Sequence, residues 1–502
     1  MPETAKQAAQ SQTALEETSA LDGFIKSAGD SIRISEGERP EFEGQVKTLI
    51  AGIIRNSDAV DTSNLSATIA GIIGEIDRKL TEQINKIIHH AKFQKLEGAW
   101  RGLYHMVNNT QTDEMLKIKV FNVSKKELTK TFKRYDGMKW EESPFFKKIY
   151  QEEYGVFGGV PFGAFVGDYH FDHSPEDVLT LSGIAQVCAA SHAPFLAAAA
   201  PSLLGFEDWQ ELINPPNISK VFDDKKYLAW KSLRQSEDAR YIGLTMPRFL
   251  ARLPYGQKTV PVKEFHFEED TEGADSSKYV WGNSAYAMGA NITRAFKDYG
   301  WCTQIRGRES GGTVPDLPCH TFPTTDGTTD VKCPAEIAIP DTRESELAKN
   351  GLIPLCYVKN STDAVFVGAQ SLQQPKVYQG KGAAAANQSA QLSARLPYLF
   401  ATCRFAHYLK CMVRDKVGKM MGKDQVKNFL QDWINNYVLP NPDDAGDEMK
   451  AKKPLADAAV EVSENEDNPG YYNAVFRLRP HFQLEAVNVS LRLVGTLKQG
   501  VS

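Results

Sequence analysis

Apolar residues recur at helical spacing through the first quarter of the chain. Leu21, Phe24 and Ile25 share one face of a short amphipathic helix over Leu15–Lys26, after a polar start that predicts disorder. Further helices are expected over about residues 40–55, from near Ser63, and from Thr81. The last of these should break near Phe93, and its apolar positions are Ile84, Ile87, Ile88, Ala91, Leu96, Trp100 and Leu103.

The middle of the chain alternates strand-like and helix-like segments, which is typical of an α/β fold. Ser174 followed by Pro175 and two acidic residues is a strong helix start, because serine caps and acidic side chains favour the N-terminal end. The expected strands are Leu116–Val123, Ala164–Asp168, Ala239–Thr245 and Trp301–Arg306, and the expected helices are Ser174–His192 and Asn283–Tyr299.

The end of the chain changes from helices to strands. Helices over Leu392–Gly418 and Lys423–Tyr437 precede a predicted hairpin of Pro454–Val462 and Tyr471–Arg479. A strongly alternating strand follows, with Val487, Val489, Leu491, Leu493 and Val494 among its apolar residues. A strand at the very end of a chain exposes an edge unless another strand pairs with it, so this pattern indicates a protein partner.

Composition adds three limits. The 502 residues suggest two to four domains, and the pattern divides them into residues 1–60, 61–375 and 376–502. A net charge of −5 argues against a general polyanion binder. The chain has no long apolar run or secretory leader, and its seven cysteines include no C-x-x-C pair; we therefore expect a reduced, cytoplasmic protein that is not embedded in a membrane.

Candidate chemistry is sparse. Asp168, His170 and Asp172 would share one face of an extended chain, as metal ligands could, but a polar strand end before the Ser174 helix start is the better explanation, because no second ligand cluster accompanies them. Cys302, Cys319, His320 and Cys333 lack the close cysteine spacing of a structural zinc site. The glycine-rich segments match no phosphate-binding motif, and no nucleophile is paired with a base. We therefore expect no enzyme activity, no metal and no cofactor, and favour a role in assembly.

The region Leu392–Tyr437 is basic. Arg404, Lys410, Arg414 and Lys419 belong to this run. A solvated helix face explains it, and the functional alternative is contact with an acidic protein surface. Few aromatic residues are interleaved for base stacking, so nucleic acid is the weaker alternative.

Several long stretches resemble the large sheath subunit of the type VI secretion system, the TssC/VipB family. They include EGAWRGLY at residues 97–104, FGGVPFGAFVGDYH at 157–170 and RFLARLPYG at 248–256, and their order along the chain is that of the family. The other matching segments are Trp281–Gly307, Leu317–Phe322, Arg404–Gly418, Trp433–Val438 and Arg479–Gly495. The resemblance covers about residues 80–500.

This resemblance implies a contractile-tail-sheath-like α/β (α+β multidomain) fold whose terminal strands form an inter-subunit handshake sheet. It also implies a small sheath subunit (TssB/VipA-like) as partner, six-fold helical assembly around Hcp-like inner-tube hexamers, and docking on an envelope-anchored baseplate. A ClpV-like AAA+ unfoldase would recycle the contracted sheath. The sheath of a related phage-tail-like particle is the alternative.

The family's functional elements transfer to specific residues of this chain. Strand exchange would involve Val487–Val494, and inner-tube contact would involve Arg404, Lys410, Arg414 and Lys419. Leu21, Phe24 and Ile25 would form the unfoldase-recognition helix, or else pack on the small subunit.

Overall fold

The computed structural model describes most of the chain between residues 65 and 483. The described residues are 37, 40–42, 44–48, 65–214, 217–271, 273, 275–324, 326–380, 383–417, 419, 421–442, 445–464 and 472–483. The predicted helix Leu15–Lys26 and the predicted strand Val487–Val494 lie outside them. The chain divides into two compact units, one of Met1–Phe93 with Pro254–Thr271 and one of Gln94–Leu253 with Glu272–Ser502.

The first unit contains the long helix α3 (Leu65–Ile88) and a loop. The Asn85 amide donates to the carbonyl of Glu268 and accepts from the backbone of Asp270, so the loop is tied to the end of α3. The predicted start at Thr81 is wrong, because α3 runs through it without interruption. The break also comes earlier than predicted, at His89–His90 rather than Phe93, before α4 (Ala91–Asn108).

The second unit holds the remaining elements. Its helices after α4 are α5 (Lys125–Arg134), η1 (Gly137–Glu142), α6 (Pro144–Phe146), η2 (Lys147–Tyr154), α7 (Pro175–Ser191), η3 (Pro201–Leu204), η4 (Trp209–Ile213), α8 (Ile218–Val221), η5 (Lys225–Tyr227), α9 (Leu228–Gln235), η6 (Asp238–Tyr241), η7 (Ser276–Lys278), α10 (Ser284–Tyr299), α11 (Asp341–Lys349), α12 (Ala383–Ser393), α13 (Leu396–Lys416), α14 (Lys423–Asn435) and α15 (Asp447–Lys452). Its strands are β1 (Phe165–Phe171), β2 (Phe195–Ala199), β3 (Ile242–Met246), β4 (Phe249–Leu250), β5 (Trp281–Gly282), β6 (Thr313–Val314), β7 (Thr321–Pro323), β8 (Thr329–Val331), β9 (Leu352–Tyr357), β10 (Ala364–Phe366), β11 (Leu455–Glu464) and β12 (Tyr472–Pro480).

A six-stranded mixed sheet forms the centre of this unit, in the order β1-β2-β3-β9-β10-β6. The pairs from β1 to β9 are parallel, and the last two pairs are antiparallel. Phe195 and Ala197 of β2 belong to one hydrophobic cluster with α7, whereas Leu196 belongs to another with α10 and α13. Since successive side chains of a strand point to opposite faces, the two clusters cover the two faces of the sheet. The predicted α/β class is confirmed.

Local sequence signals explain why several predicted elements are found close to their expected bounds. The Ser174 hydroxyl accepts from the Asp177 backbone at the start of α7, as its capping pattern predicts. The Asn283 side chain caps α10 in the same way. The strands predicted at Ala164–Asp168 and Ala239–Thr245 correspond to β1 and β3.

Two predicted strands are wrong. Residues 116–124 and 301–306 form no ladder in the structure. In the first segment, the Val123 carbonyl accepts instead from the Tyr169 hydroxyl, and Lys119 forms an ion pair with Glu153. Alternating side chains therefore indicate an extended chain in this segment, but the backbone bonds to partners other than a strand.

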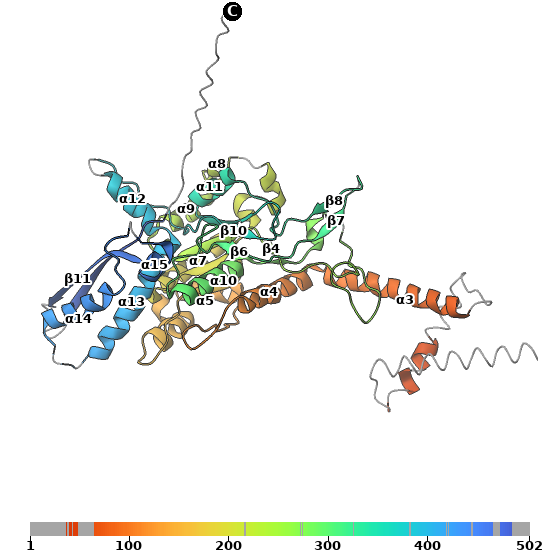
Figure 1. Cartoon of the computed structure of the whole chain (residues 1–502), viewed down its shortest axis with the longest axis horizontal. Helices are drawn as coiled ribbons and strands as arrows, with labels where there is room; N and C mark the ends of the chain where they lie inside the picture. The colour runs from red at the N-terminus through yellow and green to blue at the C-terminus, as the bar shows by residue number, and fades with distance from the viewer. Residues whose placement is uncertain are drawn as a thin grey trace, which may run out of the picture. The chain divides into compact units, whose positions relative to one another are not determined.

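The C-terminal hairpin is confirmed. β11 and β12 pair antiparallel, with Val460 opposite Phe476. Their inward side chains form a separate hydrophobic cluster with α13 and α14, and Figure 1 shows β11, α13 and α14 grouped together. None of the helices in the described part of the chain combines the length and apolar character needed to cross a lipid bilayer.

Candidate functional site

Helix α4 carries an exposed apolar row, which we call the α4 stripe. It consists of Leu96, Trp100, Tyr104 and Val107, whose exposed fractions are 57%, 66%, 68% and 46%. Spacings of four, four and three residues place the four side chains on one face of the helix. A continuous apolar row of this kind on a folded protein is a candidate surface for contact with another protein.

The opposite side of α4 explains why the apolar face points outward. Gly98 and Gly102 are buried, and a β-carbon at Gly98 would lie 2.5 Å from the carbonyl oxygen of Trp281. A β-carbon at Gly102 would lie 2.4 Å from the ring of Tyr286. The two glycines let the helix approach these residues closely, and this close approach directs the large side chains away from the unit.

Polar contacts also hold the inward-facing side of α4 against its unit. Glu97 accepts from Arg252 at 2.7 Å and from Arg101 at 2.7 Å. Burial opposes ionisation of Glu97, but the hydrogen bonds and charges of the two arginines prevail, so its pKa lies below the usual value. The Thr110 hydroxyl is 2.7 Å from that of Thr293, just after the end of the helix. The orientation of α4 is therefore well determined within its unit.

The terminal hairpin is a second candidate assembly surface. Along β12, partly buried and exposed residues alternate through all nine positions. Its outer face carries Val475, which is 54% exposed, and Arg477, which pairs with Glu461 of β11. Among the described residues, β12 has β11 as its one ladder partner, so its other edge offers backbone groups for strand addition.

The basic residues predicted to contact an inner tube lie on or just after α13. Arg404 is half-buried, and its guanidinium lies 4.7 Å from the ring centre of Tyr408 and 5.5 Å from that of Phe296. At these distances a cation is attracted to the face of an aromatic ring. This side chain therefore has a structural role within the subunit.

The next two basic residues also contact their own chain. The Lys410 ammonium lies 3.7 Å from the ring centre of Tyr154 and donates to the Tyr150 hydroxyl at 2.7 Å. Arg414 donates to the Val156 carbonyl at 2.7 Å. Lys419 differs from these residues because it is exposed. The structure thus ties α13 to the π-helix η2 and the turn that follows it.

Asp168, His170 and Asp172 lie on or just after β1 but have separate environments. Asp168 accepts from the Asn283 amide at 3.3 Å, and burial raises its pKa. Burial lowers the pKa of His170 to about 4. Asp172 accepts from the Ser174 backbone at 2.8 Å, at the start of α7. These contacts match the alternative in which the three residues form a polar strand end.

The cysteine set is also dispersed among other contacts. Nδ1 of His320 lies 2.7 Å from the Tyr279 hydroxyl. Cys302, Cys319 and Cys333 are free thiols, and burial raises the pKa of each of the three. In the part of the chain that the structure describes, no three histidine, cysteine or acidic side chains are grouped to hold a metal ion.

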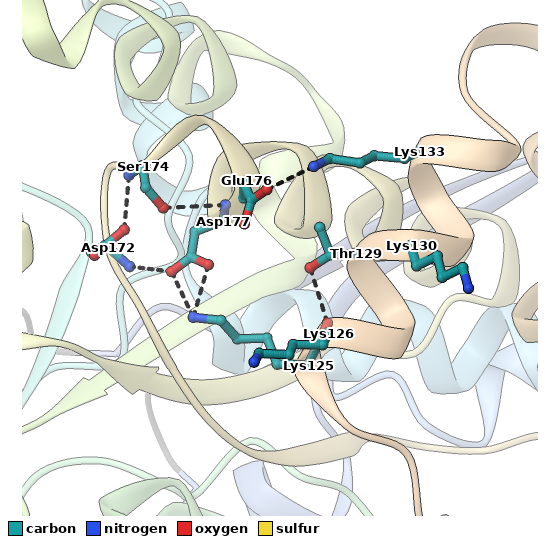
Figure 2. Close-up of a pocket in the computed structure, with 9 residues that line it drawn as sticks. All are labelled: Lys125, Lys126, Thr129, Lys130, Lys133, Asp172, Ser174, Glu176 and Asp177. Atoms are coloured by element: carbon teal, nitrogen blue, oxygen red, sulfur yellow. Dashed lines mark hydrogen bonds and ion pairs between the residues drawn. The ribbon is translucent and has the colours of Figure 1, made fainter.

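A depression of about 550 Å³ lies between α5 and the start of α7 (Figure 2). Its charged groups largely pair with one another: Lys125 binds Asp177 at 2.8 Å, and Lys133 binds Glu176 at 2.7 Å. Burial raises the pKa of Asp177, although Lys125 opposes this rise. The mixed, paired charges serve to join the two helices.

The sequence does not predict the α4 stripe as a surface. Leu96 and Trp100 follow the apolar face of a helix, and such a face ordinarily packs inward. The sequence feature that could have indicated this surface lies on the opposite side of the helix, where Gly98 and Gly102 are four residues apart. Two small residues at this spacing permit a close approach, but the sequence does not say which face makes it.

Comparisons with known proteins give one consistent result. The family model described as EvpB/VC_A0108, tail sheath N-terminal domain, matches residues 70–373, and the model for the tail sheath gpW/gp25-like domain matches residues 385–497. A curated relative from Pseudomonas aeruginosa, named type VI secretion system sheath protein TssC1, is 56% identical over 489 residues, which are 97% of each chain.

Two solved structures are also similar at low identity. The baseplate of the anti-feeding prophage, 6-fold symmetrised, is 10% identical with a TM-score of 0.34, covering 63% of this chain and 66% of the other. The helical sheath of the same particle in its contracted state is 10% identical with a TM-score of 0.31, covering 62% and 66%.

Proposed function

This chain belongs to the EvpB/VC_A0108 tail sheath family and is a type VI secretion sheath subunit, and from this premise we propose that it pairs with a small sheath subunit and polymerises into a contractile tube. The tube surrounds an inner tube of hexamers in the cytoplasm and docks on a baseplate. Contraction propels the inner tube into a target cell. The family match along nearly the whole chain is the observation that carries this proposal.

The α4 stripe supports a surface for the small sheath subunit. Burying a large apolar side chain contributes roughly 1.5–3 kcal/mol, and the stripe offers four such side chains on a helix that its glycine face holds in place. The complementary surface on the small subunit is therefore apolar.

The terminal hairpin supports strand exchange between neighbouring subunits. β12 is nine residues long and alternates inward and outward side chains, which gives an added strand a defined register. The proposed added strand is Val487–Val494 of a neighbour, whose alternation matches an edge that is solvated on one face. Backbone hydrogen bonds would then join subunits into a continuous mesh.

The contacts of α13 refine the proposed inner-tube surface. Arg404, Lys410 and Arg414 contact aromatic rings or carbonyls of their own subunit. Lys419 is the exposed member of the set and is the better candidate for contact with an acidic inner tube. Unfoldase recognition by Leu21, Phe24 and Ile25 stays a prediction.

Negative-stain electron microscopy of the chain co-expressed with its small subunit tests the proposal. Hollow, ridged tubules that require both chains are expected. Trp100→Glu should prevent co-purification of the small subunit, because it places a charge in the apolar stripe. Val377→Glu is the matched control, since Val377 is 79% exposed and lies outside the stripe. Soluble particles alone, at every salt concentration, would contradict the proposal.

A further inference from the structure

The chain is held firmly just before the segment proposed to exchange between subunits. The side-chain amide of Gln483 donates to the Thr303 carbonyl at 2.9 Å, and its carbonyl oxygen accepts from Nε of Arg306 at 2.9 Å. The Gln483 backbone N–H donates to the Tyr398 hydroxyl at 2.8 Å. One residue therefore makes three hydrogen bonds to the body of its unit. We call these three contacts the Gln483 clamp.

The residues that receive Gln483 are buried parts of the unit. Thr303, Arg306 and Tyr398 are 9%, 6% and 7% exposed. Thr303 and Arg306 belong to a segment with the sequence pattern of a strand, and the Thr303 carbonyl binds Gln483 instead of a strand partner. Hydrogen bonds in buried surroundings are costly to lose, since their partners then remain without water or protein contacts.

A second anchor lies two residues earlier. The His481 backbone donates to the Pro454 carbonyl at 3.0 Å, and its Nε2 lies 3.0 Å from the Lys453 carbonyl. Residues 481–483 are therefore attached at both ends after β12 finishes at Pro480. Phe482 between them is 64% exposed, so the attachment rests on the polar contacts of its neighbours.

The Gln483 clamp limits where the terminal segment can go. Val487 follows Gln483 by four residues, which span at most about 14 Å when fully extended. Measured from His481, the second anchor, six residues would span about 21 Å. We propose that Gln483 is a positioning residue, which fixes the point where the terminal segment leaves the body and limits how far the exchanged strand can reach. This inference rests on the strand exchange proposed above.

The test uses the complex of this chain with its small subunit. Gln483→Met keeps the length of the side chain and removes the two hydrogen bonds that the side chain makes, with Thr303 and with Arg306. The backbone hydrogen bond to Tyr398 remains. Hydrogen exchange of the peptide covering residues 481–486, in unassembled complexes, should become roughly tenfold faster, as expected for the loss of two hydrogen bonds. Tubule yield in electron micrographs should fall at least about fivefold. Gln391→Met, at an exposed glutamine of α12, is the matched control and should change neither measurement.

A second variant changes the distance that the terminal segment can span without changing the contacts of Gln483. Inserting Gly-Ser-Gly between Gln483 and Leu484 leaves the clamp intact but lengthens the reach by about 10 Å. It should reduce tubule yield as Gln483→Met does, with unchanged hydrogen exchange of residues 481–483. Normal tubules from both variants would overturn the positioning role.

A truncation distinguishes failure of this inference from failure of the proposed function. The chain that lacks Val487–Ser502 should form complexes with the small subunit but no tubules. If this truncation assembles normally, strand exchange is wrong and the role of Gln483 is wrong with it. If the truncation fails to assemble while Gln483→Met and the insertion assemble normally, only the positioning role is refuted.

Discussion

Gly98→Ala tests whether α4 docks through its glycine face. The new β-carbon would lie 2.5 Å from the Trp281 carbonyl oxygen, a backbone atom that cannot rotate away. Overpacking of this kind costs about 1–3 kcal/mol, and the rigid contact favours the upper end. Alanine in place of glycine contributes about 1 kcal/mol of helix propensity. The expected net loss in the stability of docked α4 is therefore about 2 kcal/mol.

Gly74→Ala is the matched control. Gly74 lies within helix α3, and a β-carbon there meets no atom within 4 Å. The same chemical change should then stabilise its helix by about 1 kcal/mol, because the propensity gain has no steric opposition. The two substitutions are thus expected to have opposite signs, with a difference of about 3 kcal/mol.

Hydrogen exchange measured by mass spectrometry reports both helices separately. A loss of about 2 kcal/mol should speed exchange in α4 by roughly thirtyfold, and a gain of about 1 kcal/mol should slow exchange in α3 by roughly fivefold. Slower or unchanged exchange of α4 in Gly98→Ala would refute the close approach. The outward direction of Trp100 would then need a cause other than the glycine face.

Three further predictions concern pairing, pH and recycling. Tyr104→Glu should weaken binding of the small subunit at least about tenfold in a pull-down titration, and unchanged binding would exclude the α4 stripe. Burial lowers the pKa of His407 to about 4. The fold therefore favours the neutral imidazole, and its contribution to the free energy of unfolding is complete above pH 6.5. Up to about 3 kcal/mol of this free energy is lost as the pH falls from 6.5 towards 4. Unfolding of His407→Gln should depend less steeply on pH over that range, and an equal slope would contradict this assignment. Charged replacements of Leu21, Phe24 and Ile25 should leave assembly intact and slow disassembly by the unfoldase; disassembly at the normal rate would remove the helix from that role.

The sequence predicts several elements of the second unit because its signals there are local. Capping by Ser174 and Asn283 depends on residues within one helical turn, so the starts of α7 and α10 can be identified without tertiary information. The hairpin β11–β12 is equally local, since alternation and a polar turn define it. The sheath family is also evident in the sequence, because the matching segments are long and contiguous.

Segments whose backbone bonds to distant parts of the chain are predicted less well. Trp301–Arg306 has strand-like composition, yet the Thr303 carbonyl binds the side chain of Gln483, 180 residues away. Likewise, the basic pattern of α13 could not reveal that Lys410 lies over the ring of Tyr154. Composition describes the groups that a segment offers, whereas the partners depend on how the whole chain folds.

The sequence by itself determined the α/β class, helices α7 and α10, strands β1 and β3 of the sheet, the C-terminal hairpin and the family. Only the tertiary structure decided which face of α4 packs inward. Helical periodicity places Leu96, Trp100 and Tyr104 on one side and the glycines on the other. It carries no information about which side packs against the rest of the second unit, which contains the six-stranded sheet. The close approach of Gly98 to Trp281 resolves this, because a helix can approach backbone that closely only where no β-carbon intervenes.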